Sequence, residues 1–373
     1  MRLSTRARVL PLILVVVFLV SLQLTALATQ PANDAFYRTW ERTERPVSDQ
    51  VANRTWMWGP VATTGPITEP YLEAPGGYRQ IQYFDKTRME INNPLADPYS
   101  LWFVTNGLLA KELITGDVQT GHLTRVQTEP SRSQVAGDRH PDSPTYLTLS
   151  HVLDEPTRPE GTLITEQLLI DGDDYELTES DEFEDYNVIA YYHVSETDRT
   201  VAEPFWEFMN STGIVREDGI NVRGRLFEDP FFATGFPITA AYWVHVPVGG
   251  NWRDVLLQCF ERRCLTYTPE NPDGWQVEAG NIGRHYHEFR YGRPPDVLEC
   301  VELNLATTFD LTRITNIGES RAQAIMDHRP FESVDDLQRV PGIGPVTVDR
   351  IQDQGLACIV YDPETGKVFH QPR

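Results

Sequence analysis

"RVPGIGPVTVDRIQDQG" occupies residues 339–355 and predicts two short helices joined by a tight Gly-Ile-Gly turn. Such a turn leaves backbone N–H groups pointing outward at the start of the second helix, where they can bind a phosphate. The same turn can also serve only to join two packed helices. The stretch therefore poses a choice between an anion site and a structural connection.

A second copy of this pattern lies 26 residues earlier. It matches Leu337, Arg339 and Ile351 with Leu311, Arg313 and Ile325, and it aligns Ile343-Gly344 with Ile317-Gly318. Each half predicts a short helix, a hairpin and a second helix with an apolar stripe. Residues 299–360 are therefore predicted to form a small all-α domain with two hairpins.

The two hairpins, the lead-in "ELNLAT" and the linking "PFESVDDLQRVPGIG" closely resemble the helix-hairpin-helix domain of the ComEA family of competence DNA receptors, over residues 302–356. The resemblance implies binding of double-stranded DNA through its phosphates, without reading of bases. It implies phosphate contacts from Asn316, Ile317 and Gly318 in one hairpin and from Gly342, Ile343 and Gly344 in the other. Four arginines complete the candidate DNA site: Arg313, Arg321, Arg339 and Arg350.

Two features depart from that family. The first hairpin reads Asn-Ile-Gly where the family usually has Gly-Ile-Gly, and the unit contains no lysine, so that its five arginines face nine acids. Because phosphate neutralisation supplies most non-specific affinity, such a unit should bind DNA weakly and lose binding quickly with salt. The alternative is a docking scaffold, as in a similar extrinsic photosystem subunit, within a cell-envelope interaction or wall-attachment module.

Residues 1–28 predict a secretory signal peptide. Three arginines precede an apolar run over residues 9–22, and Ala26, Leu27 and Ala28 form a small-residue cleavage site. The protein is therefore expected to be secreted or on the cell surface, with an uncleaved membrane anchor as the alternative. Removing this segment, which holds no acid, changes the formal charge from −22 to −25. Such a charge repels nucleic acid, so any DNA contact must be local.

Residues 35–120 and 200–292 read as diverged copies of one α+β unit. Pro66-Ile67-Thr68 aligns with Pro237-Ile238-Thr239. A glycine pair, a phenylalanine and an Asn-Pro pair follow in each copy, at an offset that drifts from 171 to 178. Each copy opens with a helical segment and contains a hairpin, "QYFDKTRMEI" or "QCFERRCLTY". The expected fold class is α+β, with a strand-rich two-copy region before the helical domain.

The connecting region, residues 121–199, is also expected to be strand-rich. "TYLTLSHVL" (145–153) alternates apolar and polar residues as strands do, and "DGDDYELTESDEFED" (171–185) is expected to be a solvated acidic loop. The two copies resemble LGFP-type repeats of secreted bacterial proteins. That resemblance implies a non-enzymatic extracellular module with cell-wall or envelope components as partners.

Four cysteines predict two disulfides in an exported chain. Cys259 and Cys264 bracket "FERR" in the second hairpin, where they should face each other across the strands. Cys300 and Cys358 bracket the helical domain and would close it.

No catalytic motif is present: the chain has no G-x-S-x-G, HExxH, Walker loop or CxxC. "HYHEF" (285–289) is expected to be a surface strand, with two histidines on one face that fall short of a metal site. We therefore expect no enzyme activity, cofactor, metal or small-molecule substrate.

Overall fold

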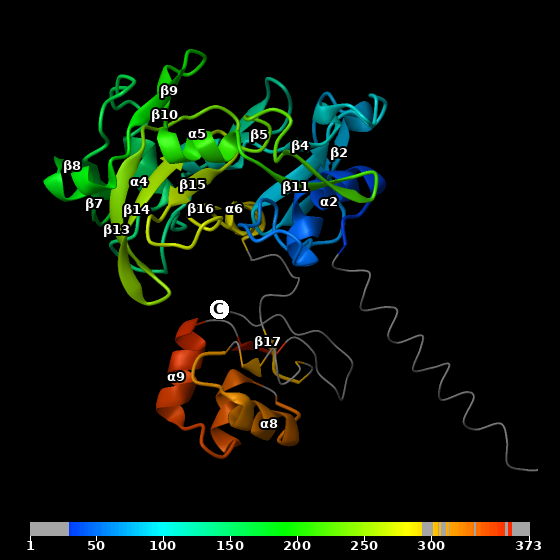
Figure 1. Ribbon diagram of the computed structural model, residues 1–373. Helices are drawn as coiled ribbons and strands as arrows, with labels where there is room; N and C mark the ends of the chain where they lie inside the picture. The colour runs from blue at the N-terminus through cyan, green and yellow to red at the C-terminus, as the bar shows by residue number, and fades with distance from the viewer. Residues whose placement is uncertain are drawn as a thin grey trace, which may run out of the picture. The chain divides into compact units, whose positions relative to one another are not determined.

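The computed structural model describes residues 30–292 and 301–359, apart from residues 305, 307–310, 313, 332 and 355–356. The chain divides into two compact units, residues 1–296 and 297–373. Figure 1 shows the strand-rich first unit from blue to yellow and the helical second unit from orange to red. The predicted signal peptide lies outside the described residues. Within the described ranges no helix is both long and apolar enough to cross a membrane.

The first unit contains two arrangements of the same order: a helix, four antiparallel strands and a closing helix. The first comprises α2 (Asp34–Ser48), β1 (Ile67–Pro70), β2 (Tyr78–Phe84), β3 (Thr87–Ile91), β4 (Thr105–Asn106) and α3 (Leu109–Thr115). The second comprises α5 (Glu203–Met209), β13 (Tyr242–Val248), β14 (Asn251–Cys259), β15 (Cys264–Tyr267), β16 (Val277–Ala279) and α6 (Ile282–Tyr291). The sheet orders are β1-β2-β3-β4 and β16-β15-β14-β13.

The intervening segments complete the unit. β7 (Glu166–Asp171) and β8 (Asp174–Glu179) extend the second sheet beyond β13, so that it has six strands. The others form three hairpins and a helix: β5 (Asp117–Gln119) with β6 (Arg125–Gln127), β9 (Ala190–Val194) with β10 (Arg199–Ala202), β11 (Thr212–Glu217) with β12 (Ile220–Arg225), and α4 (Tyr146–His151).

Hydrogen bonds of the first arrangement recur 175–176 residues later. The Gln82 side-chain amide donates to the Thr64 carbonyl over 2.9 Å, and the Gln258 amide donates to the Thr239 carbonyl over 3.1 Å. The threonine hydroxyl oxygens accept from the backbone N–H groups of Tyr83 and Cys259, respectively. The residues that match 237–239 are thus 62–64, and the alignment on Pro66-Ile67-Thr68 was wrong by four residues.

Each closing helix, α3 or α6, contacts a strand hairpin of the other arrangement. The Lys111 N–H at the start of α3 donates to the Glu261 carbonyl in the β14–β15 turn, over 3.0 Å. Reciprocally, the Gly283 N–H at the start of α6 donates to the Asp85 carbonyl in the β2–β3 turn, over 3.0 Å. Each hairpin therefore receives the helix that belongs to the other copy, which joins the copies into one body.

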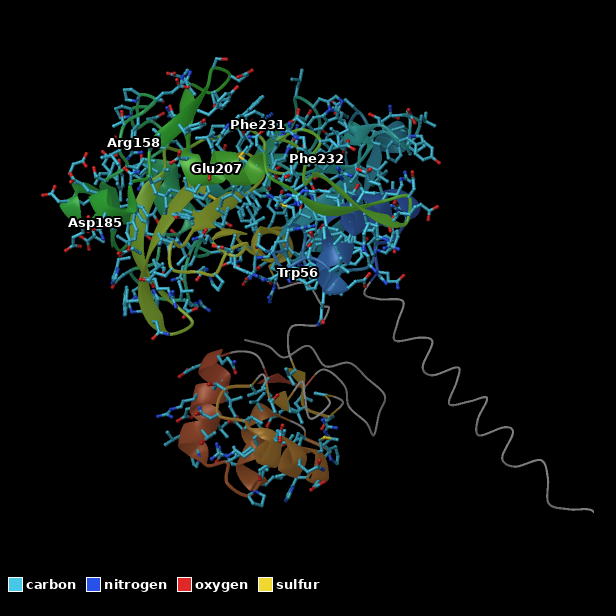
Figure 2. All side chains as sticks on the ribbon, in the orientation of Figure 1. Trp56, Arg158, Asp185, Glu207, Phe231 and Phe232 are labelled. Atoms are coloured by element: carbon cyan, nitrogen blue, oxygen red, sulfur yellow. A yellow bond between two sulfur atoms is a disulfide. The ribbon has the colours of Figure 1, made fainter. Side chains whose placement is uncertain are left out.

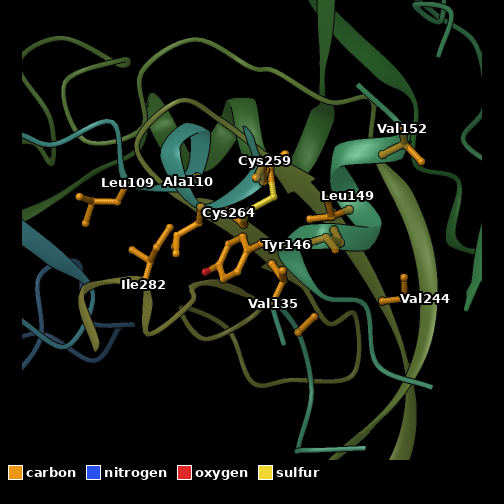
Figure 3. Packing of buried hydrophobic residues seen from close by; sticks show 14 of the residues in the cluster. Leu109, Ala110, Val135, Tyr146, Leu149, Val152, Val244, Cys259, Cys264 and Ile282 are labelled. Carbon is orange, nitrogen blue, oxygen red and sulfur yellow. A yellow bond between two sulfur atoms is a disulfide. The ribbon is translucent and has the colours of Figure 1, made fainter. Parts of the chain in front are cut away.

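Apolar side chains from both copies share a core. Figure 3 shows Leu109, Ala110 and Tyr146 in one cluster with the Cys259–Cys264 disulfide. The two cysteines pair directly across β14 and β15, and their Cα atoms lie 3.9 Å apart. A second cluster packs Phe232, labelled in Figure 2, edge-on against the Trp58 ring.

Three local expectations were wrong. "TYLTLSHVL" contains helix α4, because Tyr146, Leu149 and Val152 share one buried helical face and Thr145 caps the first turn. "DGDDYELTESDEFED" is mostly exposed, as expected, but it is not a loop: it includes strand β8, which pairs with β7, and a 3-10 helix over Asp181–Tyr186. "HYHEF" lies in helix α6, so its two histidines do not share a strand face.

The described residues of the second unit include three helical segments and one short strand pair. They are β17 (Val301–Glu302), α8 (Glu319–Asp327), η4 (Val334–Arg339), α9 (Pro345–Gln354) and β18 (Ala357–Cys358). β17 and β18 pair in parallel, so the unit is helical but not entirely α. Cys300 and the side chain of Cys358 lie outside the described residues, and the second disulfide stays a prediction. The strand pair holds the two ends of the unit together beside both positions.

Candidate nucleic-acid interface

Both hairpins of the second unit turn through a left-handed residue. Asn316 has a φ of 61° and Gly342 has a φ of 85°. Asparagine is among the few residues other than glycine that adopt this region readily. Asn316 therefore gives the first hairpin the same turn that Gly342 gives the second.

The last residue of each hairpin, Gly318 or Gly344, has a different role. Gly318 caps the start of α8 with extended backbone angles, and Gly344 precedes α9 without a positive φ. A Cβ added at either glycine would meet no atom of the described residues within 4 Å. Neither backbone conformation nor internal packing therefore requires glycine at these positions, and both leave an open surface beside a helix start.

The central isoleucines shape the hairpins from inside. Ile317 and Ile343 are buried in the core of the unit. Their N–H groups donate within the turns, to the carbonyls of Ile314 and Val340. By contrast, the N–H groups of Gly318 and Gly344 donate to no other described residue. The glycine amides, at the positive ends of two helix dipoles, are thus the ones open to an anion.

Arg321 lies between the two hairpins. Its Nη1 donates to the Asn316 carbonyl over 2.5 Å, and its Nε lies 3.8 Å from the Cβ position of Gly342. The side chain is half-buried. Its guanidinium therefore adds a positive charge beside both turns.

The other predicted arginines are placed differently. Arg339 donates to the Pro330 carbonyl and lies 4.8 Å from the centre of the Phe331 ring. Arg350 is exposed on α9, one turn before Gln354, whose side-chain oxygen accepts from the Thr315 N–H beside the first hairpin. Arg313 lies outside the described residues. Of the predicted arginines, Arg321 therefore lies at the hairpins and Arg350 lies on α9, which follows the second hairpin. Arg339 instead contacts Pro330 and Phe331.

Acidic side chains limit the strength of this site. Glu319 is exposed and directly follows Gly318 at the start of α8. Asp335 is turned toward α9, where its carboxylate accepts from the Gln352 amide over 3.0 Å. Among the described residues of the whole chain, no three histidine, cysteine or carboxylate side chains gather as a metal site would require.

The position of Arg321 was not apparent from the repeat. Residue 347, which matches it 26 positions later, is a threonine, so the period gave no reason to single it out. The geometry of the Asn316 turn is what brings the arginine across to the second hairpin.

Comparison with known proteins supports the identity of this unit. Residues 298–354 match the family described as the helix-hairpin-helix motif. A 60-residue stretch is 45% identical to a deoxyribonuclease of Thioalkalivibrio sp. (strain K90mix), covering 16% of this chain and 17% of that protein. No solved structure matches the chain. The C-terminal unit is therefore a helix-hairpin-helix domain.

Proposed function

We propose that this protein binds double-stranded DNA through its backbone, without sequence preference. The binding surface, here the hairpin face, consists of Asn316, Gly318, Arg321, Gly342 and Gly344. The observation that carries the proposal concerns Gly318 and Gly344. Neither the backbone conformation nor the packing of the described residues requires a glycine at these two positions. A bare backbone lets phosphate oxygens approach two helix-start amides, and phosphate contacts carry no base information.

The surroundings support weak binding. The domain carries nine acids against five arginines over residues 302–356, and Glu319 adjoins the hairpin face. The similarity to a protein named deoxyribonuclease favours a nucleic-acid ligand over other anions. Low affinity with a strong dependence on salt is the expected behaviour.

A methyl group at each open glycine tests the proposal. Gly318→Ala with Gly344→Ala should leave the fold intact, because neither methyl group meets a neighbouring atom. Affinity for a 20-base-pair duplex, measured by fluorescence anisotropy on the full chain, should fall at least tenfold. Gly65→Ala is the matched control, since Gly65 is equally open but lies in the first unit. Unchanged binding by the folded double variant would refute the proposal.

One alternative has specific support. The negative charge of the domain and the internal contacts of Arg339 suit a scaffold that docks an envelope component rather than DNA. Absence of duplex binding at low salt by the wild-type chain would favour this alternative.

We also propose that the protein is exported and does not act as an enzyme. The basic, apolar and small-residue order of residues 1–28 supports export. N-terminal sequencing of protein from its native envelope should find a start near Thr29, whereas an intact N-terminus would indicate a membrane anchor. Nicking of plasmid DNA in the presence of magnesium would contradict the non-enzymatic proposal.

A further inference from the structure

A cleft of about 1010 Å³ opens in the first unit, and all of its lining residues precede the helix-hairpin-helix domain in the sequence. Val255 and Thr266 of the second sheet, and Thr268 directly after β15, form part of its lining. Residues 129–139 line it from the connecting region, and one face of α6 with its N-cap residue Asn281 lines it from the second copy. Its size is that of a site for a ligand of several rings.

Comparison of the two copies shows why the cleft exists. In the first copy the matching positions, 176 residues earlier, are Arg79, Glu90 and Asn92. Arg79 donates to Glu90 over 2.9 Å and to Asn92 over 3.3 Å, and the first two side chains are buried. In the first copy, the hydrogen-bonded side chains of Arg79, Glu90 and Asn92 fill this space. In the second copy, the smaller side chains of Val255, Thr266 and Thr268 leave it open as the cleft.

The closing helices add to the difference. α6 runs for ten residues across the first sheet, where Arg290 reaches Glu69 over 3.0 Å. α3 has seven residues and ends at a left-handed cap, Gly116. The second sheet therefore lacks a counterpart of the last turn of α6.

One face of α6 supplies polar groups to the cleft. Asn281, His285 and Phe289 recur at every fourth position and all line it. The Tyr146 hydroxyl lies 3.1 Å from His285 Nδ1, and burial lowers the pKa of His285 to about 4. The ring is thus neutral at pH 7, and in the tautomer whose Nδ1 accepts from Tyr146, Nε2 is a hydrogen-bond donor.

The charge of the cleft differs from that of the unit around it. Residues 30–296 hold 22 basic and 42 acidic side chains, a net charge of −20. The cleft is lined by three cationic residues (Lys86, Arg132 and Arg139) and four acidic ones (Glu129, Asp138, Glu278 and Glu288). Its near balance favours an uncharged ligand that both donates and accepts hydrogen bonds.

We propose that this cleft binds a neutral oligosaccharide. Sugar hydroxyls both donate and accept, which suits the threonine, amide and carboxylate groups of the lining, and the Phe289 ring offers an apolar surface to pyranose C–H groups. An extended peptide fits less well. It would pair with the edge strand β16, but the Lys86 ammonium already donates a hydrogen bond to the Ala279 carbonyl of that strand, over 2.6 Å.

Calorimetric titration of the full chain tests the proposal with chitotetraose, cellotetraose and maltotetraose, and with a neutral Gly/Ser hexapeptide as the peptide probe. At least one tetrasaccharide should bind, and the hexapeptide should not. Val255→Arg with Thr266→Glu transplants the ion pair of the first copy into the cleft and should abolish binding. Phe289→Ala, a smaller change, should weaken it at least tenfold, while Thr212→Glu, at an exposed position of β11, should have no effect.

Three outcomes would overturn the proposal. They are no saccharide binding at millimolar concentration, binding of the hexapeptide instead, and saccharide binding that folded Phe289→Ala retains in full. If the double variant does not fold, the Phe289→Ala result decides.

Discussion

Replacing Gly283 by alanine should destabilise the first unit, although alanine ordinarily stabilises a helix by about 1 kcal/mol relative to glycine. Gly283 lies in the first turn of α6, against the β2–β3 turn of the other copy. A Cβ there would overlap the carbonyl oxygens of Phe84 and Thr87 and would lie 2.8 Å from the Thr87 nitrogen. All three are backbone atoms, so a side-chain rotation cannot relieve the overlap.

The size of the effect follows from what must move. Separating α6 from the turn costs about 1–3 kcal/mol in overpacking and lost contacts. Loss of the bond from the Gly283 N–H to the Asp85 carbonyl adds about 1–3 kcal/mol if these groups stay buried. After the helix-propensity gain, we expect a net loss of about 3 kcal/mol, or a melting temperature lower by about 6–12 °C for a unit of this size.

Thermal and urea denaturation, followed by tryptophan fluorescence, measure this loss. Ala110→Gly is the control, because Ala110 is the second residue of α3, as Gly283 is of α6, and its methyl group packs in the core. That change should cost only about 1 kcal/mol. A Gly283→Ala protein as stable as the wild type would refute the exchange of closing helices between the copies.

Three further predictions concern charge, covalent links and the hairpin face. Burial alone would raise the pKa of Glu69, but neighbouring arginines lower it to about 2. Stability should therefore fall by about 3 kcal/mol as the pH drops from about 4.5 to 2, a loss measurable by urea denaturation and absent in Glu69→Gln. Reducing the short Cys259–Cys264 loop should cost about 2 kcal/mol, and peptide mapping without reduction should also find the second predicted disulfide. Arg321→Ala should weaken duplex binding more than Arg339→Ala, and the reverse order in anisotropy titrations would contradict the placement of Arg321.

The helical domain was predictable because its signals are local. The 26-residue period aligns Ile317 with Ile343 and the glycines beside them; the structure shows both isoleucines in the core and both glycines at helix starts. A hairpin of this kind is specified within about ten residues of chain, and no distant segment needs to be known. The placement of Arg321 is not local in this sense, because its contact with the second hairpin depends on how the two halves pack.

The first unit was less predictable because its defining contacts join distant residues. The fold class and both hairpins followed from the sequence, but the register of the copies did not. The shared Pro-Ile-Thr sequence suggested that residue 66 matches residue 237. The hydrogen bonds of Gln82 and Gln258 instead show that Thr64 matches Thr239. Likewise, α4 alternates like a strand in sequence, and its Thr145 cap decides in favour of a helix.

The most direct test of DNA binding by the hairpin face is a salt titration of the full chain with two duplexes of unrelated sequence. Our account predicts equal affinity for both duplexes at every salt concentration. It also predicts a linear fall of the logarithm of the binding constant with that of salt, with a slope near −0.9 for each phosphate neutralised. For two hairpins we expect about two to four such phosphates. No binding at low salt, or a marked preference for one duplex, would contradict the account.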